Sequence, residues 1–185
     1  MEKNSQKENI KTGKFLAGIA VLFLLFYFLF SLVPIEWFEF FYAFFTLEFL
    51  KLIGFSGTIE FQEPVLVYLE TFSIPLGFSY LCTGLLELAL VWAATLASFG
   101  IELKKRIIGS LVGTIVLVAF NFFRIIASVL VIAWFGLDAG NFSHDLLFRV
   151  FLFVTIAGFY FIWFKWSTKQ SKKTKKLRNK LVLVV

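Results

Sequence analysis

The sequence has very few of the residues that form cross-links and metal sites. Its 185 residues include one cysteine, one histidine, one methionine and three prolines. A single cysteine excludes an intramolecular disulfide and any multi-cysteine metal cluster. Because there is only one histidine as well, the composition argues against a structural zinc site, and we expect neither a metal nor a cofactor.

Charge is also scarce. Charged residues make up 16% of the chain, whereas soluble domains hold about 25%. Hydrophobic residues make up 59%, and 27 of the residues are phenylalanine. So much apolar surface cannot be buried inside one small globule, and lipid is its natural solvent. The composition therefore predicts an all-α, multi-pass protein of the cell membrane.

The positive charge is concentrated beside the apolar runs. The net charge is +6, and eight of the 18 Lys and Arg residues lie in the tail at 165–180. Four more precede residue 15, and three form the run Lys104-Lys105-Arg106. Basic clusters next to apolar spans are the positive-inside signal, so we expect them on the cytoplasmic side beside anionic lipid. On this interpretation nucleic acid is not a partner.

Four apolar runs are candidates for membrane crossings, at residues 15–33, 82–99, 107–135 and 144–166. They predict a bundle of about four transmembrane helices, within a single transmembrane domain at 15–166. A basic N-terminal segment at 1–14 and a basic tail at 167–185 flank this domain, and both termini are expected in the cytoplasm. Residues 34–81 and 136–143 then face the outside.

Residues 36–53 leave two interpretations open. They are aromatic and helix-compatible, but they contain four charged residues, namely Glu36, Glu39, Glu48 and Lys51. Charges inside a span are costly, which favours an amphipathic helix in the outer interface over a further crossing. The following residues, 54–80, contain three glycines and two prolines and predict one or two short extracytoplasmic β-strands with turns.

Three isolated polar residues fall at a similar depth near the outer ends of their spans. Cys82 begins the second span, Arg124 lies in the outer half of the third, and His144 begins the fourth. A helix N-terminus favours a thiolate, and pairing with histidine is a usual way to activate a thiol for acyl transfer. We therefore expect Cys82 to be a nucleophile and His144 to carry protons. Arg124 would stabilise the thiolate or the oxyanion.

The residues expected to support this site are Thr83, Gly84, Glu87, Asn121 and Arg149. Gly84 would let another backbone or a substrate approach closely. Asn121 precedes Arg124 by three residues on the same helix face, and we expect it to orient the guanidinium. An alternative role for Arg124 is a structural ion pair with Glu87. Arg149 lies off the face of His144, where it would pair with Asp145.

These motifs resemble those of the archaeosortase/exosortase family. The matching positions are Cys82-Thr83-Gly84, the Asn-x-x-Arg motif from Asn121 to Arg124, and His144, and the resemblance spans roughly residues 36–166. It implies a compact, archaeosortase-like cysteine transpeptidase with Cys82, Arg124 and His144 as its catalytic triad. Such enzymes recognise a C-terminal sorting signal of exported proteins, made of a short motif, one transmembrane helix and a basic tail. They cleave near the motif and transfer the protein to a lipid or cell-surface acceptor.

Two other functions fit the same residues. A small transporter or channel subunit would use Arg124 and Glu87 to line a pathway for an anion or a proton. Against this, the sequence has no internal repeat and no pair of broken helices in corresponding halves. A non-catalytic membrane assembly factor would make the similar depth of Cys82, Arg124 and His144 a coincidence.

Overall fold

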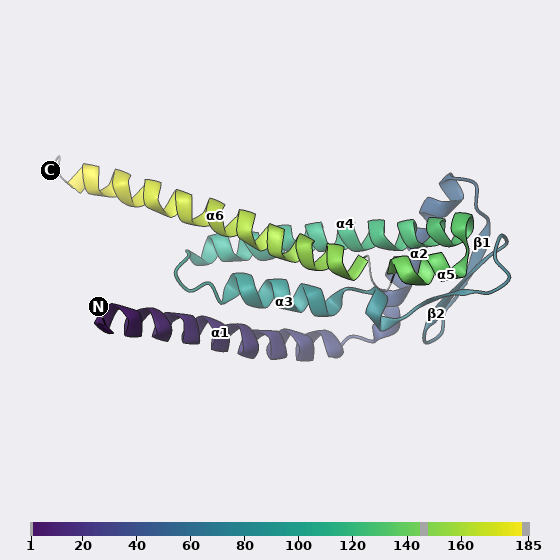
Figure 1. Ribbon diagram of the computed structural model, residues 1–185, viewed down its shortest axis with the longest axis horizontal. Helices are drawn as coiled ribbons and strands as arrows, with labels where there is room; N and C mark the ends of the chain where they lie inside the picture. The colour runs from purple at the N-terminus through teal and green to yellow at the C-terminus, as the bar shows by residue number, and fades with distance from the viewer. Residues whose placement is uncertain (1, 145–147, 183–185) are drawn as a thin grey trace.

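The computed structural model describes residues 2–144 and 148–182, and long helices dominate it (Figure 1). Three helices are long and apolar enough to cross a membrane: α1 (Glu2–Ser31), α4 (Leu103–Phe135) and α6 (Phe148–Val182). Their apolar stretches match three of the four expected spans, and α1 and α6 both continue into the basic segments beyond them. The prediction of transmembrane helices is confirmed.

The expected span at 82–99 is shorter in the structure. Helix α3 (Leu85–Leu96) has 12 residues and a length of about 18 Å, against about 30 Å of membrane hydrocarbon. A 3₁₀ turn, η1 (Tyr80–Cys82), precedes α3. Gly84 lies between them with a φ of +69°, a left-handed conformation that stops α3 from extending toward Cys82. The four-helix prediction therefore holds for three long helices, while the fourth segment is a short apolar helix packed between α1 and α4.

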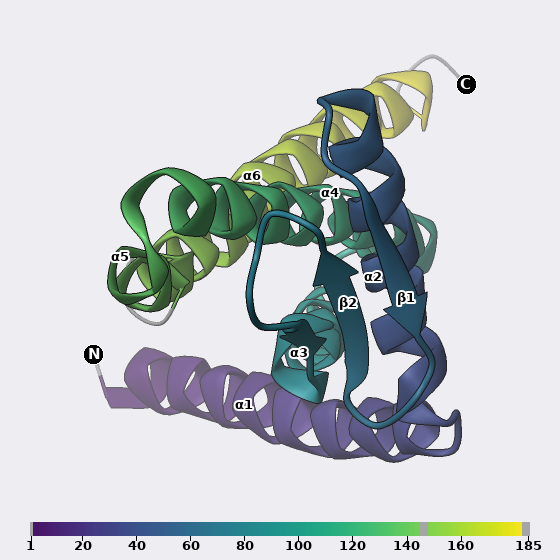
Figure 2. The ribbon, with the colours of Figure 1, turned by 90° about the vertical axis from the view of Figure 1, so that its right-hand side faces the viewer.

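Helix α2 (Ile35–Leu52) lies across one end of the bundle (Figures 1 and 2). Pro34 marks its start, and its buried face repeats every three or four residues: Glu39, Tyr42, Ala43, Thr46, Leu47 and Leu50. Trp37, Phe41 and Phe45 are exposed. This arrangement fits an interfacial helix, and α2 is not among the three candidate spans.

A small antiparallel sheet covers α2. It has three strands, β1 (Gly57–Glu60), β2 (Val65–Leu69) and β3 (Leu76–Phe78), in the order β1-β2-β3, where one or two were expected. Alternate residues of β2 are buried, namely Val65, Val67 and Leu69. The buried carboxylate of Glu39 accepts a hydrogen bond from the N–H of Val65 at 3.2 Å, which ties β2 to α2.

The segment at 136–143, expected as a polar loop, contains a short helix, α5 (Leu137–Phe142). Gly136 has a φ of +86° and lets the chain turn back from the end of α4. Gly140 packs directly on the side chain of Ile132, where a Cβ would overlap it. His144 follows α5, and the described part of α6 begins at Phe148.

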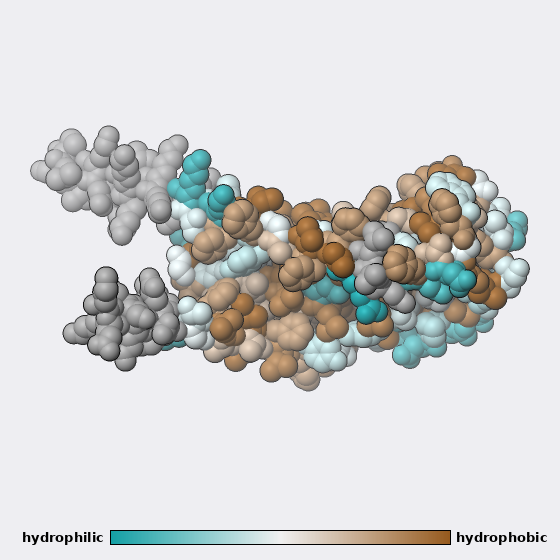
Figure 3. Space-filling model, in the orientation of Figure 1, coloured by the Kyte–Doolittle hydropathy of each residue, from teal (hydrophilic) through white to brown (hydrophobic). Residues whose placement is uncertain are grey.

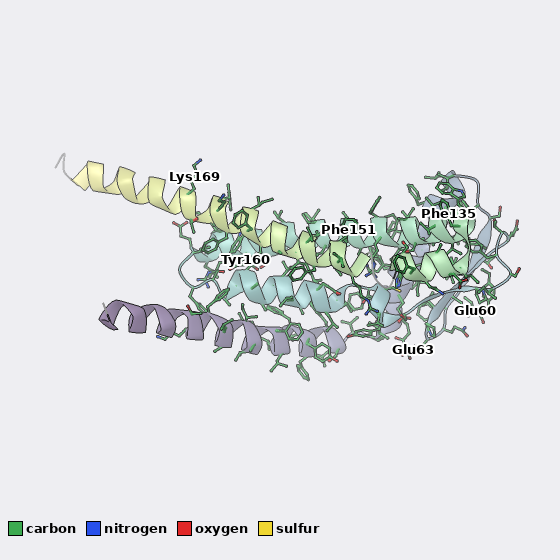
Figure 4. All side chains as sticks on the ribbon, in the orientation of Figure 1. Glu60, Glu63, Phe135, Phe151, Tyr160 and Lys169 are labelled. Atoms are coloured by element: carbon green, nitrogen blue, oxygen red, sulfur yellow. The ribbon has the colours of Figure 1, made fainter. Side chains whose placement is uncertain are left out.

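The two ends of the molecule differ in composition. We call the end with α2, the sheet and α5 the sheet end, and the end with both termini and the 97–102 loop the basic end (Figure 1). Glu60 and Glu63 lie at the sheet end, whereas Lys169 lies toward the basic end (Figure 4). Between the ends, brown apolar side chains cover most of the visible surface (Figure 3). Which of the two ends faces the cytoplasm stays a prediction.

Candidate functional site

Cys82 lies in a tight turn that joins the sheet to α3. Its N–H donates to the carbonyl oxygen of Ser79 at 2.7 Å, and the hydroxyl of Thr83 donates to the carbonyl oxygen of Tyr80 at 2.7 Å. Gly84, in the left-handed region, then turns the chain into α3. The thiol therefore lies just before the helix, outside the first turn of α3 in which we expected it.

Two buried side chains of α4 hold this turn by its carbonyl oxygens. Asn121, 2% exposed, donates its Nδ2 to the carbonyl oxygen of Cys82 at 2.5 Å. Arg124, 4% exposed, donates its Nη2 to the carbonyl oxygen of Leu81 at 3.3 Å. Residues three apart on a helix share a face, which explains why both reach the same turn. We expected Asn121 to orient the guanidinium, but its Nδ2 donates to the backbone of Cys82.

The ion pair considered between Arg124 and Glu87 is absent from the described part of the chain. The ion pairs within 4.0 Å there are Lys51–Glu48 and Lys105–Glu102. Glu87 lines two largely apolar cavities, one against α1 and one between α2, α3 and α4. Arg124 lines neither of them, so these cavities give no support to a transport pathway shared by the two residues.

The only cysteine and the only histidine lie next to each other. The Sγ of Cys82 is 4.0 Å from the Nε2 of His144 and 3.9 Å from the Oγ of Ser79. The first contact joins residues 62 positions apart, because α5 turns back from the end of α4 toward the sheet. Cys82 and His144 were expected at the site, whereas Ser79 was not, and the spacing Ser79-x-x-Cys82 was the signal that could have indicated it.

The surroundings of Cys82 favour its thiolate. Burial by itself raises the pKa of the thiol, because a charged sulfur loses hydration. The hydrogen bond with His144 and the charge of its ring lower the pKa, and the backbone and hydroxyl of Ser79 lower it further. The balance of these effects leaves the pKa of Cys82 below its ordinary value. A lowered pKa is typical of a reactive thiol.

A groove of about 420 Å³ opens beside the two side chains. One wall is the continuous segment 74–79, which includes β3, and the facing wall comes from the end of α4 and from α5. Cys82 and His144 both line this groove. A volume of this size is in the range of ligand-binding clefts.

Arg149 is exposed near the start of α6. Its expected partner, Asp145, lies outside the described residues, so that pairing stays a prediction. The structure thus brings Cys82 and His144 together, places Thr83, Gly84, Asn121 and Arg124 around the same turn, and puts Glu87 in cavities that Cys82 does not line.

Comparison of the chain with known proteins adds no relative to this description. No protein-family model, no curated protein and no solved structure matches the chain. The family resemblance of the motifs at Cys82, Asn121, Arg124 and His144 therefore stays a prediction.

Proposed function

We propose that this protein is a membrane-embedded cysteine peptidase and transpeptidase whose nucleophile is Cys82. The observation that carries the proposal is the 4.0 Å distance between the Sγ of Cys82 and the Nε2 of His144, in a groove that both residues line. A thiol beside an imidazole, with a lowered pKa and access to a cleft, meets the usual requirements of a cysteine nucleophile.

In the proposed reaction, His144 takes the thiol proton and the Cys82 thiolate attacks a peptide carbonyl carbon. The new C–S bond gives a tetrahedral oxyanion, which collapses as the peptide C–N bond breaks. The protonated His144 returns its proton to the leaving amine, and a thioester remains on Cys82. An amine, a hydroxyl or water then attacks the thioester carbon while His144 takes its proton. The C–S bond breaks, the product leaves, and the proton on His144 returns to the Cys82 thiolate.

We assign to Arg124 the stabilisation of negative charge during this reaction. The guanidinium is buried and bound to the carbonyl oxygen of Leu81, one residue from the nucleophile. Its Nε has no hydrogen-bond partner among the described residues, so this buried N–H is available to donate to a negatively charged oxygen or sulfur during the reaction. Asn121, bound to the carbonyl oxygen of Cys82, is a positioning residue that fixes the turn.

The resemblance to archaeosortases and exosortases suggests the substrate. We propose that it is an exported protein with a C-terminal sorting signal, and that the acceptor is a lipid or another surface component. In the proposed topology the basic end lies in the cytoplasm and the sheet end, with Cys82, faces outward. A transmembrane substrate helix would then present its adjoining motif at the level of the groove.

The test is the maturation of an exported protein from the same genome that ends in a short motif, an apolar helix and a basic tail. Cys82→Ala and Cys82→Ser should each abolish cleavage, with a loss of at least about 10³-fold, because no other thiol is present. Phe123→Leu, whose side chain is 62% exposed on α4, is the matched control and should process normally. Mass spectrometry of the reporter measures the cleavage, and normal maturation with Cys82→Ala would overturn the proposal.

A further inference from the structure

The groove beside Cys82 has an unusual wall. Six consecutive residues, 74–79, line it, and β3 is the edge strand of the sheet within this segment. β3 pairs with β2 in the register Val65↔Phe78, Leu66↔Gly77 and Val67↔Leu76. In Figure 2 the loop that joins β2 and β3 lies on the side of the sheet nearest α5. Because β3 is an edge strand and its three residues line the groove, its second edge is placed where its backbone groups can pair with another strand.

The facing wall is apolar. Ile125, Val129 and Ile132 of α4 and Leu137 of α5 form it, together with the polar but uncharged Ser128 and Asn141. Among the described residues, the groove lining contains no lysine, arginine, aspartate or glutamate, and its titratable members are Cys82 and His144. Away from the Cys82–His144 pair, a charged side chain entering this groove would lose hydration without meeting an opposite charge from the described lining residues.

The path of the chain links the edge strand to the nucleophile. β3 ends at Phe78, and Ser79 leads directly into the turn that carries Cys82. A peptide lying along β3 would therefore extend to the Sγ of Cys82, next to His144. Addition of an extended peptide to an exposed strand edge is a common recognition mode, in which the main chain supplies affinity and flanking pockets supply specificity.

We infer that this groove binds an extended, uncharged segment of the substrate peptide, paired with the free edge of β3 so that its scissile carbonyl meets Cys82. This inference rests on the proposed function, because it needs Cys82 to react with a peptide. It adds the binding mode and the chemical class of the residues next to the cleaved bond. The apolar wall favours uncharged side chains in the substrate residues next to the cleaved bond, and β3 forms hydrogen bonds with their backbone.

The experiment uses the full chain in detergent micelles and three peptidyl vinyl sulfones. Their peptide parts are acetyl-Ala-Val-Ala, acetyl-Ala-Lys-Ala, and acetyl-Ala-Val-Ala with the valine nitrogen methylated. The Cys82 thiolate adds to the terminal vinyl carbon, and the carbanion formed takes up a proton from His144 or water. Intact-protein mass spectrometry then measures the rate of labelling at this single thiol.

We expect the unmethylated valine probe to label fastest. The lysine probe should react at least about tenfold more slowly because its charge enters an apolar groove. The N-methyl probe should react about two- to tenfold more slowly because it loses one backbone hydrogen bond. Asn141→Asp, an isosteric change at an exposed residue lining the groove, should raise the rate of the lysine probe relative to the valine probe.

Iodoacetamide tests the proposed function separately from the inferred peptide binding, because its reaction rate depends on the Cys82 thiolate and on no peptide contact. Labelling of folded Cys82 no faster than of free cysteine at the same pH would overturn the proposed function. Fast labelling by iodoacetamide together with equal rates for the three vinyl sulfones would overturn the inference alone. Discrimination against charge but not against N-methylation would overturn the pairing with β3.

Discussion

The sheet end and the bundle bury their apolar side chains in opposite ways. At the sheet end, ten residues of α2, the sheet and α4 form one buried cluster, among them Leu50, Val67 and Val129. In the bundle the corresponding buried cluster holds only Val91, Leu117 and Leu152. The apolar stretch of α1 has 0% of its residues buried, and that of α4 has 33%.

This difference shows that two solvents act on one chain. The sheet end has an inside, as a water-soluble domain does, so the hydrophobic effect contributes directly to its stability. The bundle turns its apolar residues outward, where lipid takes the place of a core, so close helix packing and hydrogen bonds hold it together. The turn with Cys82 lies where the two meet, and side chains of α4 contact both regions.

The largest effect is expected from removing a side chain of the sheet-end core. Leu50 is 0% exposed, and Leu50→Ala should lower the free energy of unfolding by about 2–5 kcal/mol. Leu52→Ala, two residues further along α2 at a side chain 84% exposed, is the matched control and should change it by less than about 0.5 kcal/mol. Denaturant titration in detergent micelles measures both, and equal losses would show that the sheet end has no separate core.

A smaller effect is expected in the bundle, where packing leaves no room for a methyl group. A Cβ at Gly109 would overlap the indole of Trp163, whose Nε1 donates to the carbonyl oxygen of Lys105 at 3.2 Å. Gly109→Ala should therefore cost about 1–3 kcal/mol of unfolding free energy. Gly158→Ala is the control, because nothing lies within 4 Å of the added Cβ.

Gly109→Ala and Leu50→Ala together also test how far the two regions are coupled. If the regions are separate, Gly109→Ala should leave the alkylation rate of Cys82 unchanged while Leu50→Ala raises or lowers it. A change in this rate with Gly109→Ala as large as that with Leu50→Ala would contradict the division into two regions. The rate is measured by mass spectrometry in the same micelles.

The sequence is informative about the site wherever charge and polarity decide the arrangement. Acidic residues gather between 36 and 80 and basic residues gather elsewhere, and this asymmetry predicts that Cys82 and His144 lie at the same end of the molecule. Their contact agrees with that prediction. The partners of Asn121 and Arg124 could not be found in the same way. They are the carbonyl oxygens of Cys82 and Leu81, and backbone groups have no sequence signature.

The ends of the helices could not be predicted from the sequence for a similar reason. The apolar run at 82–99 has the composition of a span, but the backbone at Gly84 and the turn before it shorten α3. The segment at 136–143 has the composition of a loop, but Gly140 allows it to pack closely on Ile132 as a helix. Both outcomes depend on tertiary contacts and on a backbone conformation that local composition does not record.

The smallest expected effect concerns His144, which reaches Cys82 from the segment that follows α5. Because the hydrogen bond and charge of His144 lower the pKa of Cys82, against the opposing effect of burial, His144→Gln should raise that pKa. Alkylation of Cys82 by iodoacetamide should then slow near neutral pH, and the midpoint of its pH profile should move upward. At high pH both proteins hold the thiolate, so their rates should converge. Phe142→Ala, which removes an exposed side chain of α5, should keep the wild-type profile. An unchanged profile with His144→Gln would mean that the imidazole does not act on the thiol, and that Ser79 alone lowers the pKa of Cys82 against the effect of burial.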